Sequence, residues 1–229
     1  MYHLLSFFLK ILSCIPFKVL YVLSDGLFYL LYYVIRYRRP IVRKNLIESF
    51  PEKSGQEILK IEKKFYRFFT DQVLESCKMA TISPEEMKKR MKFTNVEEVN
   101  SVFREGKSIA LYMGHYGNWE WVSSIPLCLE KGVKAVQIYH KLRNENMDKL
   151  MLSIRERMGA ISVEMRKTAR YITGMSVARE VSIVGFIADQ SPRVNELHYF
   201  LPFLVDIYLI LFQLQILLQV KLSFSFLYL

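Results

Sequence analysis

The chain has 229 residues, which is enough for one substantial α/β domain with a small appendage but short for two full domains. Its residues are 52% hydrophobic and 24% charged, a mixture that excludes a multi-span membrane protein and favours a globular body attached to a bilayer. The formal net charge of +10 implies anionic partners, among which composition does not choose: membrane headgroups, phosphorylated substrates, acidic proteins or nucleic acid. The three cysteines form no CxxC pair, so they indicate neither a disulfide framework nor a zinc site and favour a reducing compartment.

The first 35 residues are almost entirely apolar and predict a membrane anchor. The run from Val19 to Ile35 holds one charged residue, Asp25, and is close to the lower limit of the roughly 17–25 residues that cross a bilayer. A basic cluster follows directly and consists of Arg36, Arg38, Arg39, Arg43 and Lys44. By the positive-inside rule this cluster places the rest of the chain in the cytoplasm. We assign residues 1–40 to the anchor, which either spans the bilayer or is a partly inserted helix; the alternative is a buried helical hairpin.

Helical patterns follow the anchor. Residues 42–79 show the apolar periodicity of a helix, with an aromatic-rich stripe that we interpret as core packing. Ser83 followed by Pro84 predicts the start of another helix, because serine caps a helix N-terminus and proline fits its first position. We expect a short strand at 93–96 and then a helix over 96–105.

From residue 108 onward, strand and helix signals alternate. The strands are short apolar runs, and the segments between them have helical spacing and end at glycine or polar residues. Strands are expected at 108–113, 133–139, 161–165 and 181–188, and helices at 118–131, 144–158 and 167–180. Repeated βα units of this length predict an α/β fold with a mainly parallel sheet flanked by helices. We assign residues 41–204 to this domain.

A histidine and a glutamate lie in the turn that follows the first of these strands. His115 stands between Gly114 and Gly117, and Glu120 is the second residue after Asn118, the expected N-cap. Because glycine allows unusual backbone angles, His115 can fold back over the first helical turn, where the helix dipole keeps Glu120 ionised. A carboxylate beside an imidazole fixes its tautomer and stabilises the imidazolium, as base-catalysed acyl transfer requires. The alternative is a buried histidine hydrogen-bonded in a turn, with Glu120 on a solvated helix end.

Further polar residues follow two other expected strands. Lys141 and Arg143 come after the second strand, and Asp189 comes after the fourth. Since ligand sites of parallel sheets form beyond the carboxyl ends of the strands, we expect these side chains to converge with His115 on one edge of the sheet.

Three sequence blocks resemble a known family. They are Gly-His-Tyr-Gly-Asn-Trp-Glu-Trp at 114–121, Tyr-His-Lys-Leu-Arg-Asn at 139–144 and Ala-Asp-Gln-Ser-Pro at 188–192. In order and spacing these blocks resemble the late acyltransferases of lipid A biosynthesis, the lauroyl/myristoyl transferase family, and the resemblance extends over residues 15–204. It implies a glycerolipid-acyltransferase-like fold.

The resemblance implies transfer of a fatty acyl chain from acyl carrier protein to a hydroxyl of a lipid A precursor, at the cytoplasmic face of the inner membrane. His115 would take the proton from the acceptor hydroxyl and Glu120 would orient the ring, with no metal or other cofactor. Substrate-binding roles fall on Arg143, Lys141, Arg157, Asp189 and Gln190. Asp189 matches an acidic position of the family, which implies that it either orients the active site or binds substrate. For the basic residues the alternative is a solvated surface charge, and for Asp189 it is a turn or helix cap.

Two other functions stay open at this point. One is a different glycolipid or glycerol-phosphate acyltransferase, and the other is an inactive membrane-associated fragment of such an enzyme. Nucleic-acid binding is disfavoured, because the lysines and arginines are spread over helices and the chain begins with an anchor.

Residues 205–229 differ in composition from the domain before them. They carry only Asp206 and Lys221 as charged residues and are rich in leucine, phenylalanine and glutamine. We expect an altered or truncated C-terminus here, of the kind a frameshift produces. The alternative is a genuine apolar terminal helix.

Overall fold

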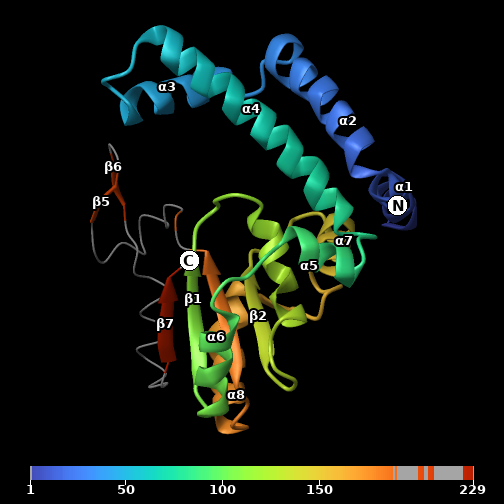
Figure 1. Ribbon diagram of the computed structural model, residues 1–229, viewed down its shortest axis with the longest axis vertical. Coiled ribbons are helices and arrows are strands. Elements are labelled where there is room, and N and C mark those ends of the chain that lie inside the picture. Colours follow the sequence, from blue (N-terminus) through green and yellow to red (C-terminus); the bar gives the residue numbers. More distant parts are fainter. Residues whose placement is uncertain (1, 188, 190–200, 204–205, 209–223, 229) are drawn as a thin grey trace.

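A computed structural model describes residues 2–187, 189, 201–203, 206–208 and 224–228 of the chain. The helices are α1 (Tyr2–Cys14), α2 (Phe17–Tyr29), α3 (Arg39–Ser49), α4 (Gly55–Lys78), α5 (Pro84–Arg90), α6 (Val96–Arg104), α7 (Glu145–Arg155) and α8 (Thr168–Val177). The strands are β1 (Ser108–Met113), β2 (Lys134–Tyr139), β3 (Ile161–Glu164), β4 (Ser182–Ile187), β5 (Leu201–Phe203), β6 (Asp206–Tyr208) and β7 (Phe224–Tyr228). The long helices α2 and α4 form an arch beyond the carboxyl ends of the strands (Figure 1).

A parallel sheet in the order β3-β2-β4-β1-β7 forms the body of the molecule. The central strand β4 pairs on one side with β1, where Met113 faces Ile187, and on the other with β2. This sheet confirms the predicted α/β fold. Strand β7 adds to the outer side of β1, and β5 with β6 forms a separate antiparallel pair. The remainder of the 205–229 segment lies outside the described residues.

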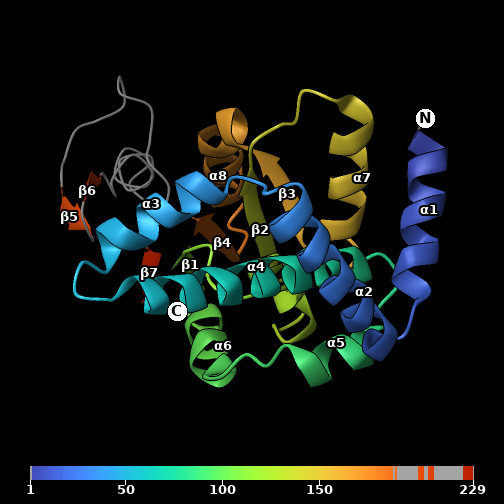
Figure 2. The same ribbon diagram turned by 90° about the horizontal axis from the view of Figure 1, so that it is seen from above.

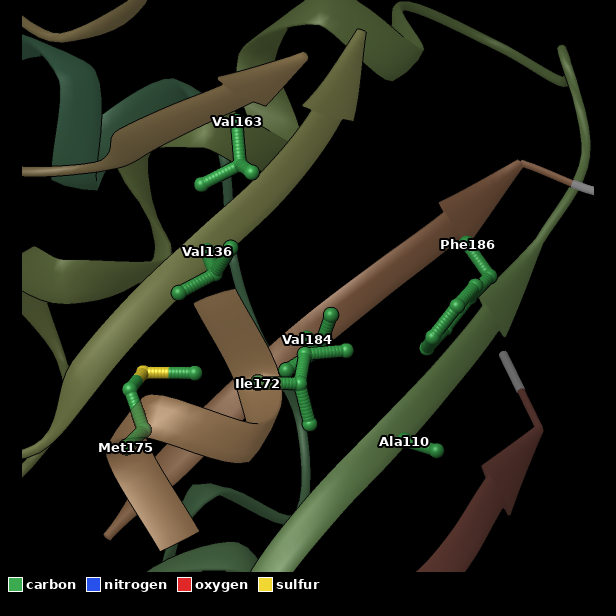
Figure 3. Packing of buried hydrophobic residues seen from close by; sticks show 7 residues of the cluster. All are labelled: Ala110, Val136, Val163, Ile172, Met175, Val184 and Phe186. Carbon is green, nitrogen blue, oxygen red and sulfur yellow. The ribbon is translucent and has the colours of Figure 1, made fainter. Parts of the chain in front are cut away.

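The neighbouring strands β1 and β4 are buried on both faces, which explains why they read as continuous apolar runs. Figure 3 shows one face, where α8 contributes Ile172 and Met175 to a cluster with strand residues. The strand residues of this cluster are Ala110, Val136, Val163, Val184 and Phe186. On the opposite face, Val99 and Phe103 of α6 pack against Ile109 and other strand residues. Successive residues of β1 therefore alternate between two cores, as a strand requires.

Helix α2 packs against α4 (Figure 2) and continues as a π-helical turn, Leu30–Val34. The carboxylate of Glu62 on α4 is fully buried and accepts hydrogen bonds from Tyr32, Arg39 and Arg43. Farther along α4, the ammonium of Lys78 donates to main-chain oxygens at the end of α1, at 2.6 Å each. These polar contacts fasten the N-terminal helices to α4.

Length and composition alone would allow Phe17–Val34 to cross a membrane, and 22% of this stretch is buried inside the molecule. Among the described residues it is the one helical stretch that meets this test.

Most predicted elements are present, and the differences have local causes. The helical pattern over 42–79 is interrupted after α3 near Pro51, and α4 then begins at a capping box formed by Ser54 and Glu57. Ser83 caps α5 as expected, since its hydroxyl accepts from the N–H of Glu86.

Two predicted elements are wrong. The strand expected at 93–96 does not form, because the chain turns at Asn95 with φ of 57° and enters α6 directly. The helix expected over 118–131 is a 3-10 helix over Trp119–Leu127. This stretch contains Pro126, which has no N–H to donate, and two serine hydroxyls bond carbonyls three residues back within it.

Candidate active site

The polar residues expected at the sheet edge follow neighbouring strands. His115 follows β1, Lys141 follows β2, and Asp189 follows β4, which lies between those two strands. Because the strands are parallel, all three segments leave the sheet at the same edge, on the side covered by the arch of α2 and α4 (Figure 1). The strand order thus confirms the expected convergence of these segments.

Asp189 holds His115 by two contacts. The backbone N–H of His115 donates to Oδ2 of Asp189 at 2.7 Å, and Nδ1 of the imidazole lies 2.7 Å from Oδ1. Since an ionised carboxylate only accepts, Nδ1 carries the proton in the neutral ring, and Nε2 is the basic nitrogen. The ring also packs edge-on against Trp119, with a centroid distance of 4.8 Å, while 32% of the His115 side chain is exposed. The result is a solvent-accessible base with an orienting carboxylate.

Gly114 makes this close approach possible. A Cβ atom at this position would lie 3.0 Å from Oδ2 of Asp189, closer than most Cβ contacts in proteins, so the carboxylate would have to shift by a few tenths of an ångström. Two positions beyond His115, Gly117 has φ of 59°, in the left-handed region that glycine adopts without strain. The glycines on either side of His115 therefore have different roles: Gly114 admits the carboxylate and Gly117 turns the chain.

Glu120 is paired with an arginine. Nε of Arg155 donates to Oε2 of Glu120 at 2.8 Å and Nη2 donates to Oε1 at 2.5 Å, so the guanidinium holds the carboxylate at both oxygens. The Glu120 side chain is 10% exposed and the Arg155 side chain is 18% exposed. In the described part of the chain Glu120 has no hydrogen bond or ion pair with His115. The carboxylate that contacts the imidazole here is Asp189, and Glu120 instead ties the turn to α7.

Removal of Arg155 should lower the free energy of unfolding. In Arg155→Met the Glu120 carboxylate stays largely buried without a cation, and we expect the free energy of unfolding to fall by about 3 kcal/mol. Adding Glu120→Gln should recover part of the loss, and a double-mutant cycle in urea should give a coupling energy above about 1 kcal/mol. The exposed pair of Lys107 and Glu105 is the control, because Lys107→Met should cost less than about 1 kcal/mol. A coupling energy between Arg155 and Glu120 no larger than the loss of stability in Lys107→Met would contradict the pairing.

The loop after β2 presents two cations. Lys141 and Arg143 are exposed, and neither has an ion pair with any described residue. The backbone N–H of Leu142, between them, donates to Oδ1 of the buried Asp148 at 2.8 Å. This bond fixes the loop so that both side chains leave it toward solvent at the same edge as His115.

Two other residues expected in the site stand apart from it. The guanidinium of Arg157 donates to the carbonyl oxygen of Ile82 at 2.5 Å, so it fastens the end of α7 to the segment before α5. Gln190 lies outside the described residues.

Arg155 was not predicted. The sequence signal available for it is its spacing, because it lies two helical turns after Asp148 and so shares the inward face of α7. That spacing shows the direction of the side chain but does not identify Glu120 as its partner.

The fold is therefore an α/β architecture whose parallel sheet has a carboxylate-paired histidine at its carboxyl edge, where ligand sites of such sheets form. Comparison with known proteins agrees: residues 1–212 match the model of the bacterial lipid A biosynthesis acyltransferase family, and the chain belongs to that family. A lipid A biosynthesis acyltransferase of Haemophilus influenzae is 24% identical over 196 residues, which are 86% of this chain and 56% of the relative. The chain thus spans about half the length of this relative.

Proposed function

We propose that this protein transfers a fatty acyl chain from the thioester of acyl carrier protein to a hydroxyl of a lipid A precursor. The observation that carries the proposal is the contact of Asp189 with Nδ1 of His115, which makes Nε2 a base at the edge of the sheet. Membership of the lipid A biosynthesis acyltransferase family supports the substrate class.

The chemistry needs one base and no redox step. Nε2 of His115 takes the proton of the acceptor hydroxyl as its oxygen attacks the thioester carbonyl carbon. The tetrahedral intermediate collapses, the carbon–sulfur bond breaks, and the imidazolium returns the proton to the leaving thiolate. Asp189 stabilises the imidazolium between these steps, while Glu120 and Arg155 hold the start of the 3-10 helix in place. The products are an ester and the free thiol of the carrier.

Lys141 and Arg143 are the candidates for binding the phosphates of the acceptor. Both are exposed on a loop fixed by Asp148, and arginine can contact a phosphate through two parallel N–H groups. For Arg157, the hydrogen bond to Ile82 supports a structural role in place of a substrate contact.

The N-terminal helices provide a surface for the membrane. Leu4, Phe7, Phe8 and Ile11 form an exposed apolar stripe on α1, and the outer face of α2 is similarly apolar. On its inner face α2 packs against α4, which carries exposed charges such as Lys64. Because each charge at the bilayer centre costs about 3 kcal/mol, helix α2 with α4 attached fits the interfacial position better than a span.

The test is an acyl-transfer assay with the protein bound to phospholipid vesicles. We expect an acyl carrier protein thioester and a lipid A precursor to yield a product heavier by one acyl ester, detected by mass spectrometry. Glycerol 3-phosphate and an unrelated glycolipid are the alternative acceptors in the same assay. Transfer only to one of these would overturn the proposed acceptor. A cooperative melt without any transfer would identify a folded but inactive fragment.

Substitution of Gly114 should lower this activity. The new Cβ of Gly114→Ala would lie 3.0 Å from Oδ2 of Asp189 and make the carboxylate shift by a few tenths of an ångström, which disturbs its contacts with His115, and we expect kcat to fall at least about tenfold. The matched control is Gly174→Ala in α8, where a Cβ meets nothing within 4 Å and alanine favours the helix. Equal rates for both variants would show that Gly114 is not needed for the approach of Asp189.

A further inference from the structure

Glu75 on α4 accepts hydrogen bonds from two residues that follow His115, Asn118 and Trp121. Its Oε2 accepts from Nδ2 of Asn118 at 2.7 Å, and its main-chain oxygen accepts from Nε1 of Trp121 at 3.2 Å. Its other carboxylate oxygen, Oε1, accepts from the hydroxyl of Tyr21 on α2 at 2.7 Å. One residue of the arch therefore holds the histidine turn on one side and the apolar helix α2 on the other.

The bond from Asn118 replaces an ordinary helix cap. Asn118 occupies the N-cap position of the 3-10 helix, where an asparagine normally accepts from a backbone N–H of the first turn. Here its side chain makes no capping bond and turns to Glu75 instead. Its Oδ1 is buried and has no hydrogen-bond partner among the described residues. The 3-10 helix therefore has no side-chain cap, and one buried acceptor is unsatisfied, while Asn118 bonds α4 instead. Local strain and unsatisfied polar groups of this kind are concentrated at functional sites.

A cleft lies between α2, α4 and the turn. Tyr21, Glu75 and Asn118 line a cleft of about 540 Å³, and Gly117 and Trp119 line the same space. Across this cleft the carboxylate of Glu75 joins Tyr21 of α2 to Asn118, while Phe17 of α2 packs edge-on against Trp121 farther along. If the carboxylate is removed, water can fill the space and Asn118 loses its bond to α4, whereas the bond from Trp121 to the main chain remains.

We propose that Glu75 is a positioning residue for His115: through Asn118 it fixes the turn in which the imidazole meets Asp189. Because Glu75 also binds Tyr21, the position of the turn depends on how α2 packs against α4. The expected effect of Glu75 on kcat rests on the proposed acyl transfer. Its expected effect on the structure of the turn does not depend on that activity.

The experiment compares Glu75→Met with Asp71→Met. Asp71 lies one helical turn earlier on α4 and has no hydrogen bond or ion pair among the described residues. We expect Glu75→Met to lower kcat at least tenfold with KM changed less than threefold, and Asp71→Met to leave both within twofold. Glu75→Gln should restore most of kcat, because the hydroxyl of Tyr21 can accept and the amide of Asn118 can flip.

A second measurement does not require activity. Hydrogen exchange followed by mass spectrometry reports on the backbone amide of His115, which donates to Asp189. We expect exchange in the peptide around His115 to be at least tenfold faster in Glu75→Met than in Asp71→Met. Equal exchange in Glu75→Met and Asp71→Met would overturn the positioning role, whether or not the wild-type protein transfers an acyl chain. Absence of acyl transfer in the wild-type protein would by itself refute only the proposed function.

Asn118→Ala covers the case in which Glu75→Met fails to fold. It removes only the donor to Glu75, and we expect the same loss of kcat and the same faster exchange. In the double variant Glu75→Met/Asn118→Ala, the loss should be no greater than in either single variant, because each acts through the other. Additive losses, or a rate for Asn118→Ala equal to wild type, would overturn the inference.

Discussion

Replacement of His115 by alanine should lower acyl transfer by about 10²–10⁴-fold, the usual contribution of a positioned general base. The variant removes Nε2, so the acceptor hydroxyl must lose its proton to water. The side chain is partly exposed and its main contacts are with Asp189 and Trp119, so we expect the melting temperature to change little. Initial rates at saturating donor, measured with the vesicle assay, give the effect on kcat.

The control for this variant is His140, which also follows a strand at the carboxyl edge of the sheet. His140 is exposed, and its Nδ1 lies 3.0 Å from the carbonyl oxygen of the next residue. His140→Ala should keep kcat within about twofold, because no carboxylate of a described residue contacts the ring to set its tautomer. A His115→Ala variant as active as His140→Ala would remove His115 from the mechanism.

The same assay decides which carboxylate orients the imidazole. The amide of Asp189→Asn can turn its NH₂ group toward Nδ1 and favour the wrong tautomer, so kcat should fall by about 10²-fold. Glu120→Gln keeps the contact of Asp189 with His115, and we expect a smaller loss that follows the decrease in stability. The opposite order of effects would assign the orienting role to Glu120, as the spacing of the two residues in the sequence suggests.

The sequence was sufficient to predict four of the five strands of the sheet and its polar edge, because both depend on local patterns. The strands are short apolar runs, and the residues at their carboxyl ends could be identified without knowing the strand order. The partner of His115 could not be identified in this way. Asp189 reaches the imidazole because β4 pairs with β1, and pairing between strands distant in sequence depends on the whole fold.

The pairing of Glu120 escaped prediction for a similar reason. Glu120 is close to His115 in sequence, so the two were expected to interact. In the fold Arg155 from α7 approaches from another part of the chain and occupies both carboxylate oxygens. Charged pairs of this kind depend on how helices dock, which neither spacing nor composition determines.

Glu62 presents the largest electrostatic effect expected on stability. Its side chain is 0% exposed, whereas its partners Arg39 and Arg43 are 23% and 43% exposed. Burial alone would raise the pKa of Glu62, but hydrogen bonds from Arg43 and Tyr32 outweigh it and hold the pKa below its ordinary value. The arginines can rehydrate if the carboxylate is removed, but the carboxylate cannot rehydrate if the arginines are removed. Two arginines of the basic cluster that follows the expected anchor thus bind a buried carboxylate.

The double variant Arg39→Met/Arg43→Met should therefore be the more damaging change. Methionine keeps much of the apolar stem, so the main loss is charge, and we expect the free energy of unfolding at pH 7 to fall by about 3–5 kcal/mol. Glu62→Leu, which removes the buried charge, should cost about 1–2 kcal/mol. Urea unfolding in mild detergent, followed by the fluorescence of Trp119 and Trp121, measures both.

Acidification should reduce the difference in the free energy of unfolding between wild type and the double variant Arg39→Met/Arg43→Met. In wild type the lowered pKa of Glu62 contributes stability above the unfolded pKa of about 4.3, and this contribution is lost as pH falls through the folded value. Without the arginines, burial should raise the pKa of Glu62, so the folded variant binds a proton as pH falls from 7 toward 5 and regains stability. The control Lys44→Met removes an exposed partner of Glu48 on the same helix and should cost less than about 1 kcal/mol at either pH. A deficit in the double variant that does not change between pH 7 and pH 5 would mean that Glu62 is not left as an uncompensated buried charge, and that lost packing explains the effect.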